Sequence, residues 1–197
     1  MPWCAPRCLA MSHLPVHSIA SAPAASQPLL EEAKERFGFL PNLLGMLSSS
    51  PSALEGYLRL TELFSATAFS PAEQQLVLLA ASAQNSCSYC VAAHTVIAGM
   101  EELDPMVIEA IRAGTPIPDQ HLQALRQFTQ DVISRDGWLE PEQVERFLSA
   151  GYSESQCLDV ILGIALKTLS NYANHLAGTP LDSAFATAGW RDGHADR

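Results

Sequence analysis

The prolines of this chain stand where helices are expected to begin. Six of them occupy apparent first helical positions: Pro41, Pro51, Pro71, Pro105, Pro141 and Pro180. Several of these six directly follow a residue that can cap a helix. Proline suits that position because its missing N–H would have no partner there and its fixed φ fits a helix. Glycines, which readily stop a helix, stand near the matching ends: Gly38, Gly99, Gly114, Gly137, Gly151 and Gly178.

Alanine and leucine dominate the composition, with 28 and 26 residues, whereas valine and isoleucine number eight each. Because β-branched residues lose side-chain freedom in a helix, this bias favours helix over strand. The sequence therefore predicts an all-α fold. We expect helices over the ranges 27–36, 41–49, 51–66, 71–84, 86–99, 105–113, 119–135, 141–149, 153–177 and 180–187.

Length and charge limit the possible partners. The 197 residues suit one large domain, and we expect a mobile N-terminal segment over 1–25, a single helical domain over 26–188 and a C-terminal tail over 189–197. The net charge of −10 leaves no basic stripe for a phosphate backbone, so no nucleic-acid partner is expected. No apolar run of about 20 residues suits a membrane, and five cysteines do not suit a secreted disulfide framework. We therefore expect a cytoplasmic protein without a membrane partner.

Two segments of the chain align at a constant offset of 83 residues. Ser70 aligns with Ser153, and residues 77–79 align with residues 160–162. Such matches indicate an internal duplication of a helix pair, although sequence rich in alanine and leucine also produces them by chance. The second copy lacks the cysteine pair described next, so the chemistry would belong to the first copy.

A cysteine pair and a histidine carry the strongest chemical signal. Cys87, Cys90 and His94 follow one another at spacings of three and four residues, in a helix that is expected to begin near Ser86 as its N-cap. This spacing places the three side chains on one helical face. We expect no cofactor and no metal ion in this site.

The arrangement suits thiol chemistry. A helix N-terminus favours a thiolate, and a Cys-x-x-Cys pair at helical spacing lies near disulfide geometry. His94 is expected to hydrogen-bond the Cys90 sulfur and to move a proton. The pair can then attack an electrophilic oxygen or sulfur, form a sulfenic acid and close a disulfide. Since no charged residue occurs from Gln74 to Met100, the helix dipole and His94 are expected to be the only local groups that tune the thiols.

Three other interpretations stand beside this one. Buried cysteines often only fill space in a core. Zinc would find three ligands in the Cys-x-x-Cys pair and the histidine, but the sequence offers no evident fourth. A thioredoxin-like domain also uses Cys-x-x-Cys, but it requires a sheet that this sequence does not predict.

Residues 82–95, SAQNSCSYCVAAHT, resemble the alkylhydroperoxidase D core of the carboxymuconolactone decarboxylase superfamily, with its C-x-x-C-x-x-x-H signature. Residues 38–51 and 171–182 resemble the longer peroxidase-related members of that superfamily. The resemblance implies an alkylhydroperoxidase D-like helical bundle with an internal duplication. It also implies a homo-oligomer (dimer, trimer or hexamer) and a thiol-dependent peroxidase or disulfide reductase, with a hydroperoxide substrate and an external dithiol or protein reductant. By the same resemblance, Cys90 attacks the peroxide, Cys87 resolves the product and His94 relays protons.

One position departs from the family pattern. Alkylhydroperoxidase members have a glutamate twelve residues before the first cysteine, linked to the histidine as a proton acceptor, and this chain has Gln75 there. Glutamine can orient an imidazole but cannot remove its proton. Glu73 lies on the wrong helical face to replace it, and Ser70 and Glu73 form a predicted capping box. A lyase like carboxymuconolactone decarboxylase and a non-catalytic thiol sensor therefore stay as alternative functions.

The remaining candidates have weaker signals. Asn171 and His175, four residues apart, either line the same cavity or belong to the core. Cys157 is interpreted as a packing residue. Cys4 and Cys8 have no histidine nearby in the sequence.

Overall fold

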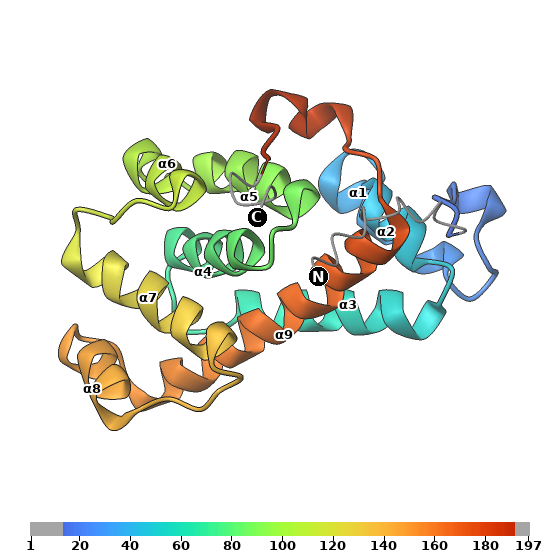
Figure 1. Cartoon of the computed structure of the whole chain (residues 1–197). Coiled ribbons are helices and arrows are strands. Elements are labelled where there is room, and N and C mark those ends of the chain that lie inside the picture. Colours follow the sequence, from blue (N-terminus) through green and yellow to red (C-terminus); the bar gives the residue numbers. More distant parts are fainter. Residues whose placement is uncertain (1–13, 192–197) are drawn as a thin grey trace, which may run out of the picture.

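The computed structural model describes residues 14–191, and every regular element in that range is a helix. Figure 1 shows α9 crossing the molecule from α8 at one end to α1 and α2 at the other. The elements of the described range are η1 (Ile19–Ser21), α1 (Gln27–Phe37), α2 (Asn42–Leu47), α3 (Pro51–Ser65), α4 (Pro71–Gln84), α5 (Ser88–Met100), α6 (Pro105–Ala113), α7 (Gln120–Ser134), α8 (Pro141–Ser149), α9 (Glu154–Ala177) and η2 (Ser183–Ala188), where η marks a 3-10 helix. None of these helices is long and apolar enough to cross a membrane.

The sequence predicted where most helices begin. Pro51, Pro71, Pro105 and Pro141 are first helical residues, as expected. Pro41 is instead the N-cap of α2, where its extended backbone turns the chain into the helix.

The prediction of a helix over 180–187 is wrong, because the structure has a 3-10 helix, η2, that begins three residues later. Residues 179–182 have no regular structure, and η2 begins only after Asp182. The reason is tertiary, because the Asp182 carboxylate accepts hydrogen bonds from the Asn42 N–H and the Tyr89 hydroxyl, at 3.1 Å and 2.5 Å. These bonds fix the chain where the expected helix would begin.

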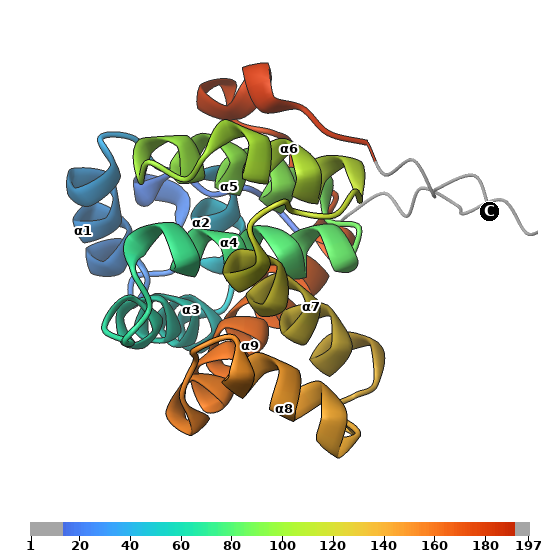
Figure 2. The same ribbon diagram turned by 90° about the vertical axis from the view of Figure 1, so that its left-hand side faces the viewer.

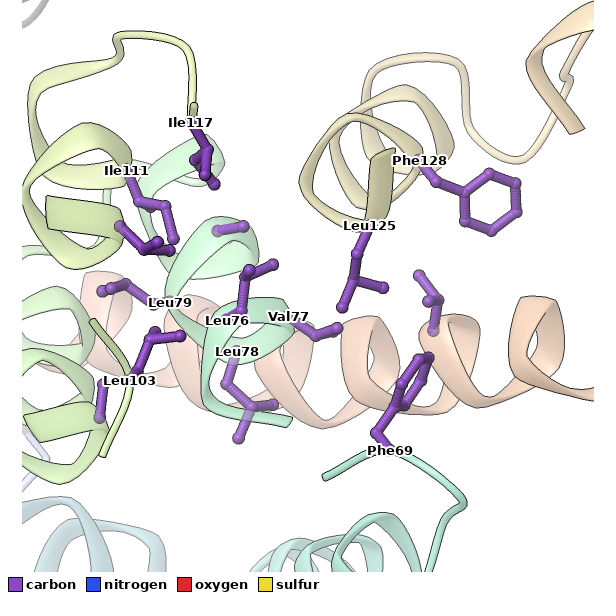
Figure 3. Packing of buried hydrophobic residues seen from close by; sticks show 14 of the residues in the cluster. Phe69, Leu76, Val77, Leu78, Leu79, Leu103, Ile111, Ile117, Leu125 and Phe128 are labelled. Atoms are coloured by element: carbon purple, nitrogen blue, oxygen red, sulfur yellow. The ribbon is translucent and has the colours of Figure 1, made fainter. Parts of the chain in front are cut away.

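Helix α4 lies at the centre of the molecule and contacts α3, α5, α6, α7 and α9. Figure 3 shows its apolar side chains pointing in several directions into the core, with Leu76, Val77 and Leu79 fully buried. Because its neighbours surround it, α4 is apolar on nearly every face. Gly163 lets α9 approach this core closely, since an added Cβ would lie 2.8 Å from Phe64 and 3.0 Å from Val77.

A second apolar cluster joins α1, α2, α3 and α5 with η2 and includes both cysteines of the predicted site. The part of the N-terminal segment that the structure describes packs onto it. The His17 N–H donates to the Gly45 carbonyl at 3.1 Å, and Ala22 is buried. At the other end of the chain, Trp190 Nε1 donates to the Arg112 carbonyl at 3.0 Å.

The internal duplication stays a prediction. Ser70 and Ser153 each cap a helix through a capping box, and Val77 and Val160 are both fully buried. The first segment, however, breaks between α4 and α5, whereas the second is the continuous helix α9.

Candidate active site

A tight turn between α4 and α5 places the cysteine pair. Cys87 is the N-cap of α5, Ser88 is the first helical residue, and Cys90 therefore lies in the first turn. The prediction that Ser86 caps this helix is wrong, because Ser86 adopts the left-handed conformation, with φ of 56°, inside the turn. The Cys87 N–H bonds back to the Ser82 carbonyl at 3.0 Å. The turn thus ends at Cys87, and the helix begins two residues later than expected.

The two sulfur atoms are buried beside the far half of α9. Cys87 and Cys90 are free thiols, and each is 1% exposed. Asn174 Nδ2 donates to the Cys90 sulfur at 3.2 Å and lies 3.9 Å from the Cys87 sulfur. Ser170 Oγ lies 4.0 Å from the Cys90 sulfur. A polar edge of α9 therefore faces the dithiol.

The two thiols have opposite acidities. The Cys87 thiol is hydrogen-bonded to the Cys90 sulfur, and this bond holds the pKa of Cys90 well below its usual range. Burial opposes this effect, whereas the positive charge of Lys167 and the side-chain amides of Asn174 and Asn171 add to it. The same bond and burial raise the pKa of Cys87. The hydrogen bond therefore makes Cys90 the more acidic and Cys87 the less acidic thiol of the pair.

A buried lysine completes the polar part of the site. Lys167 on α9 is 1% exposed, and its Nζ donates to His94 Nε2 at 2.8 Å. His94 Nδ1 lies 2.9 Å from Gln75 Oε1. Both ring nitrogens of His94 are thus occupied, and neither bonds a cysteine sulfur. The expectation of a His94–Cys90 hydrogen bond is wrong, and so is the expectation that the helix dipole and His94 alone tune the thiols.

These bonds also define the protonation of the histidine. A lysine ammonium only donates, so Nε2 accepts and the ring proton stays on Nδ1, which donates to Gln75 Oε1. Burial lowers the pKa of His94 well below its usual range, and the charge of Lys167 lowers it further. His94 is therefore a neutral imidazole. The positive charge of the site resides on Lys167.

A cavity of about 220 Å³ opens onto these groups. Cys90, His94, Lys167 and Tyr57 line its polar part, and burial raises the pKa of Tyr57 so that its phenol stays protonated. The other lining side chains are almost all apolar: Phe37, Phe39, Pro41, Leu43, Leu44, Tyr89, Ala93, Val96, Ile97, Met100, Ala184 and Phe185. The cavity therefore suits an apolar molecule that presents one reactive polar group to Cys90.

Asn171 and His175 do not share a cavity. Asn171 is fully buried, and its Oδ1 accepts from Asn85 Nδ2 at 3.0 Å. His175 is exposed and stacks against Tyr172, with ring centroids 6.4 Å apart, so it belongs neither to the site nor to the core.

The other cysteines lie away from the dithiol. Cys157 is partly buried against the main core, its sulfur lies 3.8 Å from the Ser153 carbonyl, and burial raises its pKa. It is a packing residue, as predicted. Cys4 and Cys8 lie outside the residues that the structure describes. Within residues 14–191, no group of three or more His, Cys, Asp and Glu side chains is arranged to hold a metal ion.

Glu73 has the capping role that was predicted for it. Its Oε2 accepts from the Ser70 N–H at 2.9 Å, and its Oε1 contacts Tyr152 and His121 at 3.1 Å and 3.2 Å. Both carboxylate oxygens of Glu73 therefore already have partners at the start of α4.

Sequence reasoning missed Lys167, Asn174 and Tyr57. The only signal for Lys167 was its isolation, since it is one of two lysines in the chain and follows the apolar stretch 160–166. Asn174 and Tyr57 carried no signal of their own.

Fold and site together define an all-helical protein with a buried Cys-x-x-Cys dithiol at a helix N-terminus. Residues 51–118 match the model of the Carboxymuconolactone decarboxylase family. This segment begins with α3, ends after α6 and contains Gln75, Cys87, Cys90 and His94. No curated protein matches the chain.

Solved structures share the fold. An alkylhydroperoxidase AhpD core structure, of a peroxidase-related protein from Ralstonia eutropha JMP134, matches with a TM-score of 0.78 at 22% identity, over 89% of this chain and 94% of that one. A peroxidase-related protein from Silicibacter sp. TM1040 matches with a TM-score of 0.75 at 18% identity, over 89% and 93%. A cysteine-to-alanine variant of the debrominase Bmp8, in complex with 2,3,4-tribromopyrrole, matches with a TM-score of 0.74 at 16% identity, over 90% and 95%. The family match and these structures confirm the resemblance and the alkylhydroperoxidase D-like fold predicted from the sequence.

Proposed function

We propose that this protein is a thiol-dependent reductase of organic hydroperoxides. The observation that carries the proposal is geometric: Cys90 lines an apolar cavity, Cys87 stands beside it as the N-cap of α5, and Asn174 Nδ2 lies 3.2 Å and 3.9 Å from the Cys90 and Cys87 sulfur atoms. The lowered pKa of Cys90 and the raised pKa of Cys87 support this proposal. A nucleophilic thiolate and an adjacent resolving thiol are the two groups that reduction of a peroxide by a dithiol requires.

In the first step, the Cys90 thiolate attacks the terminal oxygen of the hydroperoxide. The S–O bond forms as the O–O bond breaks, so sulfur loses two electrons and the peroxide gains them. The products are a sulfenic acid on Cys90 and an alkoxide, which takes a proton from the ammonium of Lys167 and leaves as an alcohol. Lys167 supplies this proton because it lines the cavity beside Cys90 and His94 holds it in place.

In the second step, the Cys87 sulfur attacks the Cys90 sulfenic acid. A disulfide forms, and the hydroxyl leaves with the Cys87 proton as water. An external dithiol then reduces the disulfide by two electrons and returns both thiols, and the Cys90 proton passes to Lys167. The sum is hydroperoxide plus dithiol to alcohol, water and the oxidised dithiol.

Thiol counting in the reduced protein tests the proposal. Cumene hydroperoxide should remove two thiols per chain from the wild type and none in Cys90→Ser. Cys87→Ser should lose one thiol and hold a sulfenic acid that dimedone traps. Cys157→Ser is the matched control, because that cysteine lies outside the cavity, and it should behave as the wild type.

Continuous turnover with dithiothreitol separates the alternatives. Repeated oxidation and reduction supports the reductase, whereas a single stoichiometric oxidation without recycling identifies a thiol sensor. Unreactive thiols would contradict the proposal and leave the lyase alternative. Homo-oligomeric assembly stays a prediction, which sedimentation at several protein concentrations measures.

The apolar cavity also favours a second candidate, reductive removal of bromide from an aromatic substrate. In that reaction the Cys90 thiolate takes bromine from the ring carbon and becomes a sulfenyl bromide, while the carbon takes a proton from the Lys167 ammonium. Cys87 then displaces bromide as the disulfide closes, and the Cys87 proton returns to Lys167. Bromide release from 2,3,4-tribromopyrrole, set against alcohol release from cumene hydroperoxide, decides between the two substrates.

A further inference from the structure

A second concave site lies outside the dithiol cavity. It is a groove of about 620 Å³ where the end of α4, the end of α6 and the middle of α7 meet, and it shares no lining residue with the Cys90 cavity. Figure 2 shows these three helices converging, with the chain after η2 passing nearby. Trp190 and Arg191 form the remaining wall.

The groove is cationic, although the chain as a whole is strongly acidic. Its lining includes Arg112, Arg126 and Arg191 but no Asp or Glu, while the net charge of the chain is −10. The Arg112 guanidinium already has partners within the protein. Its Nε lies 3.5 Å from Glu109 Oε1, and its Nη1 donates to Thr95 Oγ1 at 2.9 Å. The available positive charge therefore belongs to Arg126 and Arg191.

Arg126 is buried without a counter-ion. The residue is 4% exposed, one guanidinium nitrogen donates to the Thr115 carbonyl, and Nε has no hydrogen-bond partner. No carboxylate in the part of the chain that the structure describes forms an ion pair with it. A buried charge left in this state is costly, and a bound anion would relieve the cost through charge-assisted hydrogen bonds.

The rest of the lining limits the kind of anion. Trp190 and Ile111 offer apolar surface, and the four glutamines Gln84, Gln123, Gln127 and Gln130 offer neutral polar groups. The volume is large enough for a small organic molecule and not only for an inorganic ion.

We propose that this groove binds a small organic anion, with its carboxylate or phosphate held by Arg126 and Arg191 and its apolar body against Trp190 and Ile111. Carboxylate and phosphate share the planar or forked acceptor geometry that a guanidinium recognises. The site is independent of the thiol chemistry, because neither cysteine lines it.

Trp190 provides the readout. The chain has two other tryptophans, so a Trp3→Phe, Trp138→Phe background leaves Trp190 as the only tryptophan emitter. Phenyl phosphate, benzoate and inorganic phosphate are titrated separately in 150 mM NaCl. We expect a saturable change of Trp190 fluorescence with at least one of the two aromatic probes. The comparison of phenyl phosphate with benzoate identifies the preferred anion.

Arg126→Gln should weaken binding about tenfold, the loss expected for one charge-assisted contact. Arg146→Gln is the matched control, since it removes the same charge from an exposed arginine of α8 outside the groove. If circular dichroism shows that Arg126→Gln does not fold, the binding test is made with Arg191→Gln instead, since Arg191 is exposed. The proposal is overturned if no aromatic probe gives a saturable change, or if the groove variant binds as tightly as Arg146→Gln.

Discussion

Lys167 Nζ and His94 Nε2 share a hydrogen bond of 2.8 Å, although 73 residues separate them in the chain. This bond places a positive charge in a cavity that the sequence around the cysteines predicted to be uncharged. Burial lowers the pKa of His94, and the charge of Lys167 beside Nε2 lowers that pKa further. The basic group that raises the positive potential around Cys90 is therefore the lysine and not an imidazolium.

Replacing Lys167 should make Cys90 a weaker nucleophile at neutral pH. Lys167→Met removes the positive charge that helps to lower the Cys90 pKa, so the pH at which half of Cys90 becomes thiolate should rise. Iodoacetamide labelling of Cys90, followed by mass spectrometry across a pH series, measures the shift. Lys34→Met, at an exposed position of α1, is the control. An unchanged labelling profile in Lys167→Met would show that Cys87 and the helix N-terminus alone maintain the thiolate.

Replacing Gln75 by glutamate should raise the rate of hydroperoxide turnover. A carboxylate 2.9 Å from His94 Nδ1 would stabilise the protonated ring, so His94 could pass a proton through Lys167 to the leaving oxygen. Alcohol release from cumene hydroperoxide under dithiothreitol recycling measures the rate. Gln75→Met, which keeps the volume and removes the hydrogen bond, should lower it. Equal or lower activity in Gln75→Glu would count against a relay role for this position.

Glu73 should make stability depend on pH. Hydrogen bonds from Ser70, Tyr152 and His121 outweigh burial and lower its pKa in the folded state. A lowered folded-state pKa adds stability above the unfolded value of about 4.3, and this stability is lost as pH falls through the folded-state pKa. Glu73→Gln should therefore cost about 1 kcal/mol at pH 7 and little at pH 3. Urea unfolding at both pH values tests this, with Glu62→Gln in an exposed ion pair as the control.

Two glycines should respond in opposite directions to alanine. A Cβ at Gly163 would lie 2.8 Å from Phe64, inside van der Waals distance, so Gly163→Ala should destabilise the fold by about 1–3 kcal/mol. At Gly99, near the end of α5, a Cβ would meet nothing within 4 Å. Gly99→Ala should therefore stabilise by up to about 1 kcal/mol through helix propensity. Paired urea denaturation curves measure both values, and a neutral Gly163→Ala would mean that Phe64 moves freely.

The contact between Gln75 and His94 could be predicted from the sequence. The two residues lie on consecutive helices joined by a short turn, and α4 and α5 pack against each other. Local capping signals also placed most helices within one or two residues. They failed where a distant partner set the backbone, as at Asp182, and where the left-handed Ser86 shifted the start of α5.

The sequence by itself determined most of the helices and the position of the dithiol near the start of a helix, because these depend on capping, spacing and propensity within about a dozen residues. Only the tertiary structure decided the charge of the site. Which face of α9 meets the cysteines depends on how that helix packs beneath α3, α4 and α5, and this packing brings Lys167 and Asn174 to His94 and Cys90. Electrostatic effects act through space across the buried cavity, so distance along the chain does not predict them.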